Sequence, residues 1–122
     1  MASKGVLMNA LFDQFVSFVK ELTEMYPNDS DFSLFLTSIK MIRMTNPSLL
    51  VNYVNDTTSK YEDQILKKDE KFFLENSFTE YDVDANIFDK LKTYIRSMTD
   101  SDKENVWKYI QNITRLAKAC RP

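Results

Sequence analysis

Apolar residues recur at intervals of three and four along most of the chain, which is the spacing of one buried face on an α-helix. The stretch from Val6 to Tyr26 follows this spacing without interruption. The sequence predicts a helix that ends at Tyr26, because Pro27 disfavours the helical conformation of the residue before it. The side chains expected to face the core are Met8, Leu11, Phe12, Phe15, Phe18, Val19, Leu22 and Met25.

A second helix is predicted from Ser30 to Thr45. The Ser30 hydroxyl can accept a hydrogen bond from a free backbone amide at the start of this helix, and Asp31 lies favourably near its positive end. The apolar spacing continues through Phe32, Phe35, Leu36, Ile39, Ile42 and Met44. This helix is therefore expected to bury one face in a shared core.

Asn46 and Pro47 predict the start of a third helix, with the amide side chain at the cap and proline at the first helical position, where no N–H is needed. Helix is expected from Tyr53 to Leu66. The polar residues 56–59 have poor helix propensity, so they can kink or interrupt it.

Residues 67–74 form either the last turns of the third helix or a separate short helix, and 75–83 is expected to be the longest loop. Asp84 can then cap a further helix. The predicted buried residues of that helix keep the three-and-four spacing and are Ile87, Phe88, Leu91, Met98 and either Tyr94 or Ile95.

The last helix is expected to begin at a capping box formed by Ser101 and Glu104, in which each side chain satisfies the other residue's free amide. Its apolar face holds Val106, Trp107, Ile110, Ile113, Cys120 and either Leu116 or Ala117. One Gly and three Pro in 122 residues argue against a β-sandwich or barrel, which needs many turn glycines. The sequence predicts an all-α protein, a compact single-domain bundle of five to six helices over residues 1–122, with flexible ends at about 1–5 and 120–122.

Residue types that usually carry chemistry are nearly absent. The chain has no His, one Cys and one Gly, so most catalytic triads, metal sites and phosphate-binding glycine loops cannot be assembled. Cys120 has no His to deprotonate it and falls on an apolar helix face, where a thiol behaves as a small apolar side chain. We therefore predict no catalytic residue, no cofactor and no enzyme activity.

Asp82, Asp84 and Asn86 alternate like the first three ligands of a helix-loop-helix calcium site. The sixth position of such a loop needs a glycine and the twelfth needs a bidentate Glu. This sequence has Ile87 and Thr93 at those positions. The pattern is therefore typical of a solvated acidic loop, and we predict no metal site.

Charge and hydropathy restrict the setting in which the protein works. A formal net charge of -2 gives no overall attraction to nucleic acid or to anionic membranes. No apolar stretch approaches the roughly 20 residues that cross a bilayer. A lone cysteine and the lack of a secretory signal peptide favour the reducing interior of a cell, so the protein is expected to be intracellular and not membrane-bound.

Basic residues concentrate on the polar side of the last helix, at Lys108, Arg115, Lys118 and Arg121. Such a stripe can lie along a phosphate backbone, which would indicate nucleic-acid binding. The alternative is an ordinary solvated helix face, whose positive charge favours the negative C-terminal end of the helix. We favour this second interpretation.

The aromatic and methionine content is high, with 9 Phe, 6 Tyr and 6 Met. Most of these side chains are expected in the core, but large apolar residues left on a surface mark contact sites. Phe72, Phe73 and Leu74 are the best candidates, because three consecutive bulky residues on a helix cannot all face one side. The leading hypothesis is a non-enzymatic interaction or structural module that binds another protein or itself. The alternative is a nucleic-acid-associated packaging or regulatory protein.

Four short segments, taken together in their order along the chain, resemble a known group of proteins. They are Tyr26-Pro27-Asn28, Asn46-Pro47-Ser48-Leu49, Lys68-Asp69-Glu70-Lys71-Phe72-Phe73-Leu74 and Val106-Trp107-Lys108-Tyr109-Ile110. Together they resemble small helical proteins of unassigned role found in large DNA viruses of algae and protists. The resemblance spans most of the chain and rests on the order of core and turn residues. It implies a virus-encoded protein of the host cytoplasm or nucleus, or of the virion, and it carries over no active-site residue or partner.

Overall fold

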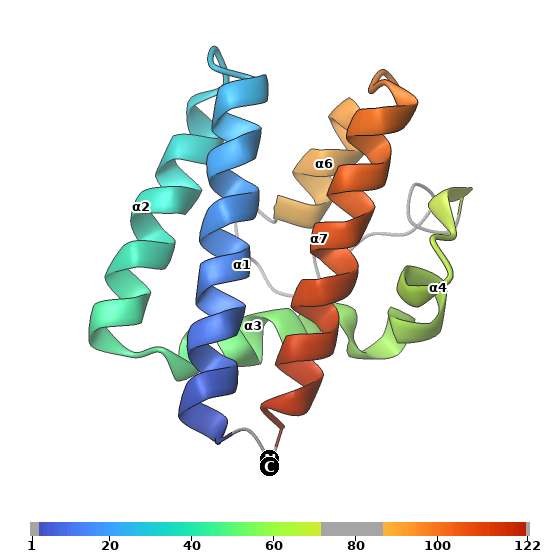
Figure 1. Ribbon diagram of the computed structural model, residues 1–122. Coiled ribbons are helices and arrows are strands. Elements are labelled where there is room, and N and C mark those ends of the chain that lie inside the picture. The colour runs from blue at the N-terminus through green and yellow to red at the C-terminus, as the bar shows by residue number, and fades with distance from the viewer. Residues whose placement is uncertain (1–2, 72–86, 122) are drawn as a thin grey trace.

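The computed structural model describes residues 3–71 and 87–121. In these ranges the chain forms six α-helices, a short 3-10 helix and no strand, which confirms the all-α class (Figure 1). The elements are α1 (Lys4–Met25), α2 (Ser30–Thr45), α3 (Ser48–Thr58), η1 (Ser59–Tyr61), α4 (Glu62–Leu66), α6 (Ile87–Ile95) and α7 (Asp100–Ala119).

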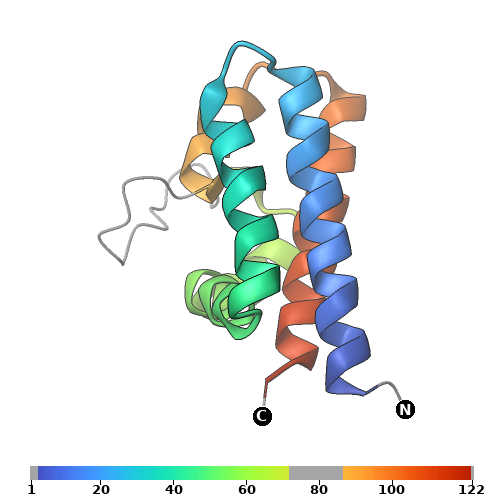
Figure 2. The ribbon, with the colours of Figure 1, turned by 90° about the vertical axis from the view of Figure 1, so that its left-hand side faces the viewer.

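α1 is the central helix of the bundle. It packs along α2 on one side and along α7 on the other, and these three long helices run side by side in Figures 1 and 2. α3 crosses the bundle near one end, where it contacts α7, α2 and α1, and α4 packs against α7. The long helices therefore share one interior.

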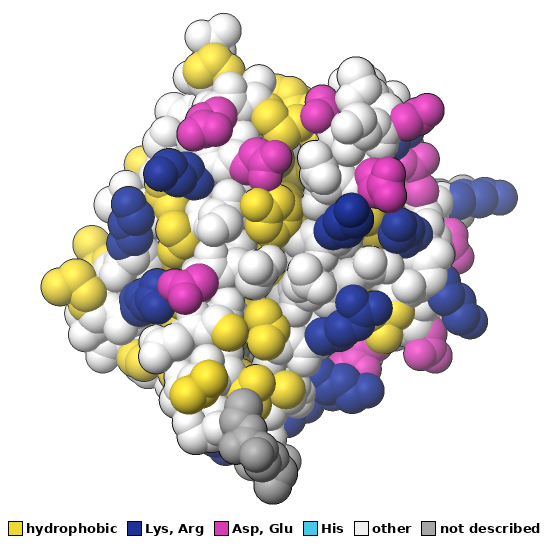
Figure 3. Space-filling model, in the orientation of Figure 1, with side chains coloured by type: hydrophobic (Ala, Val, Ile, Leu, Met, Phe, Trp, Pro, Cys, Tyr) yellow, Lys and Arg dark blue, Asp and Glu magenta, His cyan; other side chains and the backbone are white. Residues whose placement is uncertain are grey.

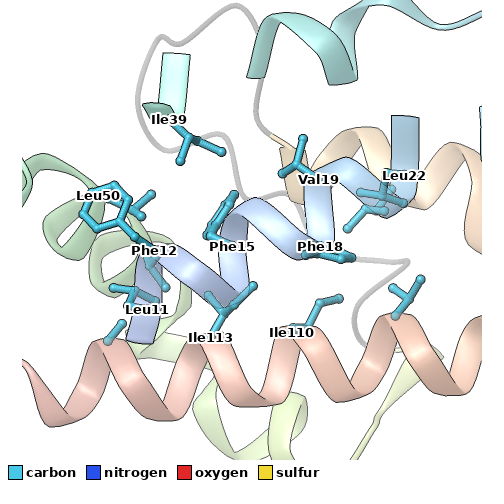
Figure 4. Packing of buried hydrophobic residues seen from close by; sticks show 14 of the residues in the cluster. Leu11, Phe12, Phe15, Phe18, Val19, Leu22, Ile39, Leu50, Ile110 and Ile113 are labelled. Carbon is cyan, nitrogen blue, oxygen red and sulfur yellow. The ribbon is translucent and has the colours of Figure 1, made fainter. Parts of the chain in front are cut away.

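The interior is built around the apolar stripe of α1. Phe12, Phe15 and Phe18 are each 1 % exposed. Figure 4 shows this stripe lying above α7, whose Ile110 and Ile113 point toward α1. Complete burial of a side chain of this size contributes about 1.5–3 kcal/mol relative to leaving it in water. Other fully buried large side chains include Leu11, Leu22, Phe32, Leu91, Ile95 and Ile110.

The open alternatives on the last two helices are now resolved. Ile95 is 1 % exposed while Tyr94 is half-buried, and Ala117 is fully buried while Leu116 is half-buried. Near the chain ends, Lys4 and Gly5 already belong to α1, and Cys120 is buried.

Two helices are capped by a different residue from the one predicted. α2 is capped by Asp29, whose carboxylate accepts from the amide two residues later at 3.1 Å, so the prediction of Ser30 is wrong. α7 is capped by Thr99, whose hydroxyl accepts from the amide three residues later at 3.1 Å, and the prediction of Ser101 is wrong. Asp, Ser and Thr are all good caps. Where they are neighbours, the backbone path of the turn selects one.

The predicted interruption after the third helix is confirmed. α3 ends at Thr58, and η1 separates it from α4. The hydroxyls of Thr57 and Thr58 donate to the backbone carbonyls four residues earlier, at 2.7 Å and 2.8 Å. Such hydroxyl bonds compete with the helix ladder and often bend a helix.

The start of α3 corrects the prediction for Asn46 and Pro47. α3 begins at Ser48, and Pro47 precedes it with helical φ and ψ but no side-chain cap. The side-chain oxygen of Asn46, Oδ1, accepts a hydrogen bond from the Ser48 hydroxyl at 2.7 Å and not from a backbone amide. The boundary is therefore correct to one residue, but its capping chemistry differs.

Candidate functional site

The outward side of α2 is almost uncharged. Nine of its residues are exposed, and only Lys40 among them carries a charge. A solvated helix normally has charged and polar residues opposite its buried stripe. We call this surface the α2 face, and its residues are Ser30, Ser33, Leu34, Thr37, Ser38, Lys40, Met41, Met44 and Thr45.

Large apolar side chains form a line along the α2 face. Leu34 is 64 % exposed, Met41 60 % and Met44 88 %. Leu34 and Met41 are about two helical turns apart and so lie on the same side of α2. Leu49, in the first turn of α3, is 49 % exposed. Viewed from this side in Figure 2, no described helix crosses in front of α2, and apolar side chains protrude along the left edge of Figure 3.

Met44 was predicted to belong to the buried stripe of this helix, but it is exposed. It follows the buried Ile39 by five residues, which places it about 140° around the helix from that side chain. Leu34 and Met41 lie outside the buried stripe that the apolar spacing of this helix predicts. The signal that could have identified them is the scarcity of charge at the positions opposite the buried stripe.

The outward side of α7 has the opposite character. Five of its nine exposed residues are charged, and Lys and Arg side chains gather over this helix in Figure 3. Lys108 and Arg115 are exposed, and neither forms an ion pair with any residue that the structure describes. These two cations therefore face solvent.

Lys118 and Arg121 are held by an acidic residue of α4. Lys118 Nζ lies 3.5 Å from Glu62 Oε2, and the Arg121 guanidinium forms an ion pair with the same carboxylate. Arg121 Nε also donates to Asn55 Oδ1 at 2.9 Å, while Asn55 Nδ2 donates to the Ala117 carbonyl at 2.9 Å. Glu62 thus neutralises part of the predicted basic stripe, and these bonds fasten the end of α7 to α3 and α4.

A shallow groove of about 320 Å³ lies between α1 and α7 beside Lys108. Burial, and then a hydrogen bond to Glu21, raise the pKa of Tyr109 in this groove. A carboxylate at this position repels a phosphate group. The lining residues are Gln14, Glu21, Asn105, Lys108, Tyr109 and Asn112.

A cluster of titratable groups lies where α6 meets the turn between α1 and α2. Lys90 Nζ lies 3.0 Å from Asp29 Oδ2 and 2.9 Å from Asp31 Oδ2. The Tyr94 hydroxyl donates to Asp29, and the Tyr94 ring stacks on Tyr26 with centroids 3.9 Å apart. These residues border an open hollow of about 580 Å³.

Asp29, Lys90 and Tyr94 are each stabilised in the charge state that they have at neutral pH. The hydrogen bond from Tyr94, and then those from Lys90, lower the pKa of Asp29. The hydrogen bonds to Asp31 and Asp29 raise the pKa of Lys90, and the bond to Asp29 raises that of Tyr94. A general acid or base works best with a pKa near the operating pH. We therefore interpret the cluster as a clamp that fastens α6 to the start of α2.

The remaining chemical candidates are structural in character. Cys120 is 4 % exposed, and burial raises the pKa of its thiol, which disfavours the nucleophilic thiolate. Within residues 3–71 and 87–121, no three His, Cys, Asp or Glu side chains are grouped so that they could hold a metal ion. No helix in those same ranges has the length and apolar character needed to span a membrane.

The predicted contact residues Phe72, Phe73 and Leu74 lie outside the described residues, and so does the acidic segment at 82–86. Their roles stay predictions. The α2 face and the basic residues of α7 are therefore the surfaces on which a functional argument can be built.

No family model, curated protein sequence or solved structure matches this chain. The resemblance to small helical viral proteins, and the intracellular setting that it implies, stay predictions.

Proposed function

We propose that this protein is a non-enzymatic interaction module that binds another protein through the α2 face. The observation that carries the proposal is the exposure of Leu34, Met41 and Met44 on a surface where one residue in nine is charged. Centres of protein interfaces are enriched in apolar and methionine side chains and depleted of charge. The α2 face has this composition.

The free energy available from burying this line is large enough to support association. A large apolar side chain contributes about 1.5–3 kcal/mol when it leaves water. Three such side chains offset a substantial part of the roughly 4–15 kcal/mol that association costs in lost translational and rotational freedom. Met41 and Met44 also adapt their shape to a partner more readily than branched side chains do. Leu49, in the first turn of α3, is a further large apolar side chain that is exposed.

A charge placed in the middle of the α2 face tests the proposal. Met41→Lys should remove the proteins that the wild-type chain retains in a pull-down quantified by mass spectrometry, because binding would bury an unpaired ammonium. Ser17→Lys is the matched control, since Ser17 is exposed on α1 and the substitution adds the same charge. Circular dichroism should show equal helix content in all three proteins. Equal retention by Met41→Lys and Ser17→Lys contradicts the proposal.

Nucleic-acid binding along α7 is the second candidate function. Lys108 and Arg115 favour it, because they are exposed without ion pairs among the described residues and lie about two turns apart on one side of the helix. Glu21 in the adjacent groove and Glu62 beside Lys118 act against it. This balance of charge places the candidate below protein binding.

The second candidate is tested by salt-dependent binding to duplex DNA and RNA, measured by fluorescence anisotropy. Each lost phosphate contact should reduce the slope of log affinity against log salt by about 0.9 on DNA. Changing Lys108 and Arg115 to Glu should therefore remove about two contacts. The control changes Lys20 and Lys40 to Glu, which alters net charge equally at exposed positions of α1 and α2. Absence of binding at low salt eliminates the candidate.

A further inference from the structure

We infer that the protein bound by the α2 face is a second copy of this chain, with α2 packed against α2 in antiparallel orientation across a two-fold axis. The inference rests on the function proposed above and names its partner. A two-fold interface requires a surface that is complementary to itself. The α2 face meets this requirement in the spacing of its apolar residues, in the size of its central residues and in the charges at its two ends.

Two of the three large apolar residues of the α2 face, Leu34 and Met41, are related by a midpoint at its centre. Leu34 and Met41 are equally distant in sequence from the midpoint between Thr37 and Ser38. A two-fold axis at that midpoint places Leu34 of each copy opposite Met41 of the other. Both ends of the contact are then filled by a pair of large apolar side chains.

Small side chains occupy the centre of the proposed crossing. Thr37 and Ser38 are exposed and uncharged. Helices pack with their axes about 8–10 Å apart, and the side chains at the contact set the distance, so small residues there allow a close approach. The Thr37 hydroxyl already donates to the Ser33 carbonyl at 3.1 Å, so its burial leaves no unpaired donor.

The charges at the two ends of α2 favour the antiparallel orientation. At the N-terminal end, Asp29 and Asp31 both pair with the ammonium of Lys90. Within the described part of the chain, these pairs leave an excess of one negative charge. Toward the C-terminal end, Lys40 is exposed and has no ion pair within the described residues. Antiparallel pairing brings unlike ends together and opposes the two helix dipoles, whereas parallel pairing brings like ends together.

Met44 separates antiparallel from parallel pairing. With the axis between Thr37 and Ser38, position 31 of one copy lies opposite Met44 of the other. The two Met44 residues are then about 20 Å apart at 1.5 Å per residue, whereas the two Ser38 residues are almost level. In parallel pairing, each position lies level with its own copy.

Cross-linking of single introduced cysteines tests the arrangement. The full chain with Cys120→Ala, which removes its one native thiol, carries either Ser38→Cys or Met44→Cys and is treated with a bis-maleimide that reaches about 10 Å. Ser38→Cys should give a covalent dimer and Met44→Cys should give none. Adding Leu34→Lys to the Ser38→Cys protein should abolish the dimer. Sedimentation equilibrium of the wild-type chain should give twice the monomer mass.

Three results would overturn the inference: equal cross-linking at both positions, a dimer in sedimentation without a cross-link at Ser38, or a wild-type chain that stays monomeric. The third result is separable from failure of the proposed function. A monomeric wild-type chain that retains a foreign protein, which Met41→Lys loses, uses the α2 face for a different partner. If Met41→Lys changes neither self-association nor foreign binding, the proposed function fails as well.

Discussion

α2 and α7 flank the same central helix and have equal numbers of exposed residues, but their outward sides differ in kind. On α7, five of nine exposed residues are charged, and Lys118 reaches the Glu62 carboxylate. On α2, one of nine is charged and three are large and apolar. Both helices bury apolar side chains against α1. Inward spacing thus identifies the packed side of a helix, while the outward charge content indicates what covers the other side.

The largest expected effect comes from weakening the interior that both helices share. Phe15→Ala should lower the free energy of unfolding by about 3–5 kcal/mol, because a buried ring is replaced by a cavity. Phe15 is 1 % exposed and packs edge-on against Phe18 at 6.5 Å between centroids. Urea denaturation followed by circular dichroism measures the change. Ser17→Ala is the exposed control, with an expected change within about 0.5 kcal/mol. Unfolding of the wild-type chain in two separate steps would show that α2 and α7 do not share one interior.

A smaller loss of stability is expected when the N-terminal cap of α2 or of α7 is removed, and its size should differ between the two helices. Asp29→Ala and Thr99→Ala each remove a cap that is worth about 0.5–2 kcal/mol. Asp29→Ala should lower the free energy of unfolding more, because Lys90 and Tyr94 also lose their acceptor. The same denaturation assay compares the two variants. A larger loss for Thr99→Ala would contradict the interpretation of the Asp29 cluster as a clamp.

The clamp also predicts a pH dependence. The bonds from Tyr94 and Lys90 lower the pKa of Asp29 in the folded state. Stability from this group is therefore complete above the unfolded carboxyl pKa, about 3.9, and is lost as pH falls through the folded value. Denaturation of the wild-type chain between pH 5 and pH 2, compared with Asp29→Asn, should show a steeper loss in the wild type. Equal slopes of stability against pH for the two proteins would contradict the predicted contribution of Asp29.

The smallest effect is expected on the charged side of α7. Lys118→Ala should change the free energy of unfolding by about 0–1 kcal/mol, because an exposed ion pair contributes little and is screened by salt. The Lys118 side chain is 59 % exposed. Lys108→Ala is the matched control, because Lys108 is exposed and forms no such pair with any residue that the structure describes. A difference between them that persists in 1 M salt would show that the Glu62 contact is more than a screened surface pair.

The interior could be predicted from sequence because it depends on local periodicity. The α1 stripe through Phe12, Phe15 and Phe18 is regular over the whole helix, and all three rings are buried. The interruption near Thr58 follows from hydroxyl side chains that bond to their own helix. Caps were misplaced by one or two residues, because Asp29 and Ser30 are both competent acceptors and the choice between them depends on the turn.

The surfaces could be predicted less well, because they depend on residues far apart in sequence. Glu62 meets Arg121 across 59 positions, and Asp29 meets Tyr94 across 65. No local pattern indicates such contacts, so the partial neutralisation of the basic stripe by Glu62 cannot be predicted from the sequence. Leu34 and Met41 can be identified from local sequence, but the signal is the scarcity of charge around them and not the recurrence of apolar residues.

The clamp of α6 on the α1–α2 turn has a practical consequence. Lys90 and Asp31, 59 positions apart, are joined at 2.9 Å on the outside of an interior to which α1 and α7 both contribute. A polypeptide cut between Lys71 and Ile87 would therefore keep its two pieces together. Expressed as separate genes, those pieces should therefore act as a complementation pair, in which reassembly of the bundle is read out by a reporter split between them.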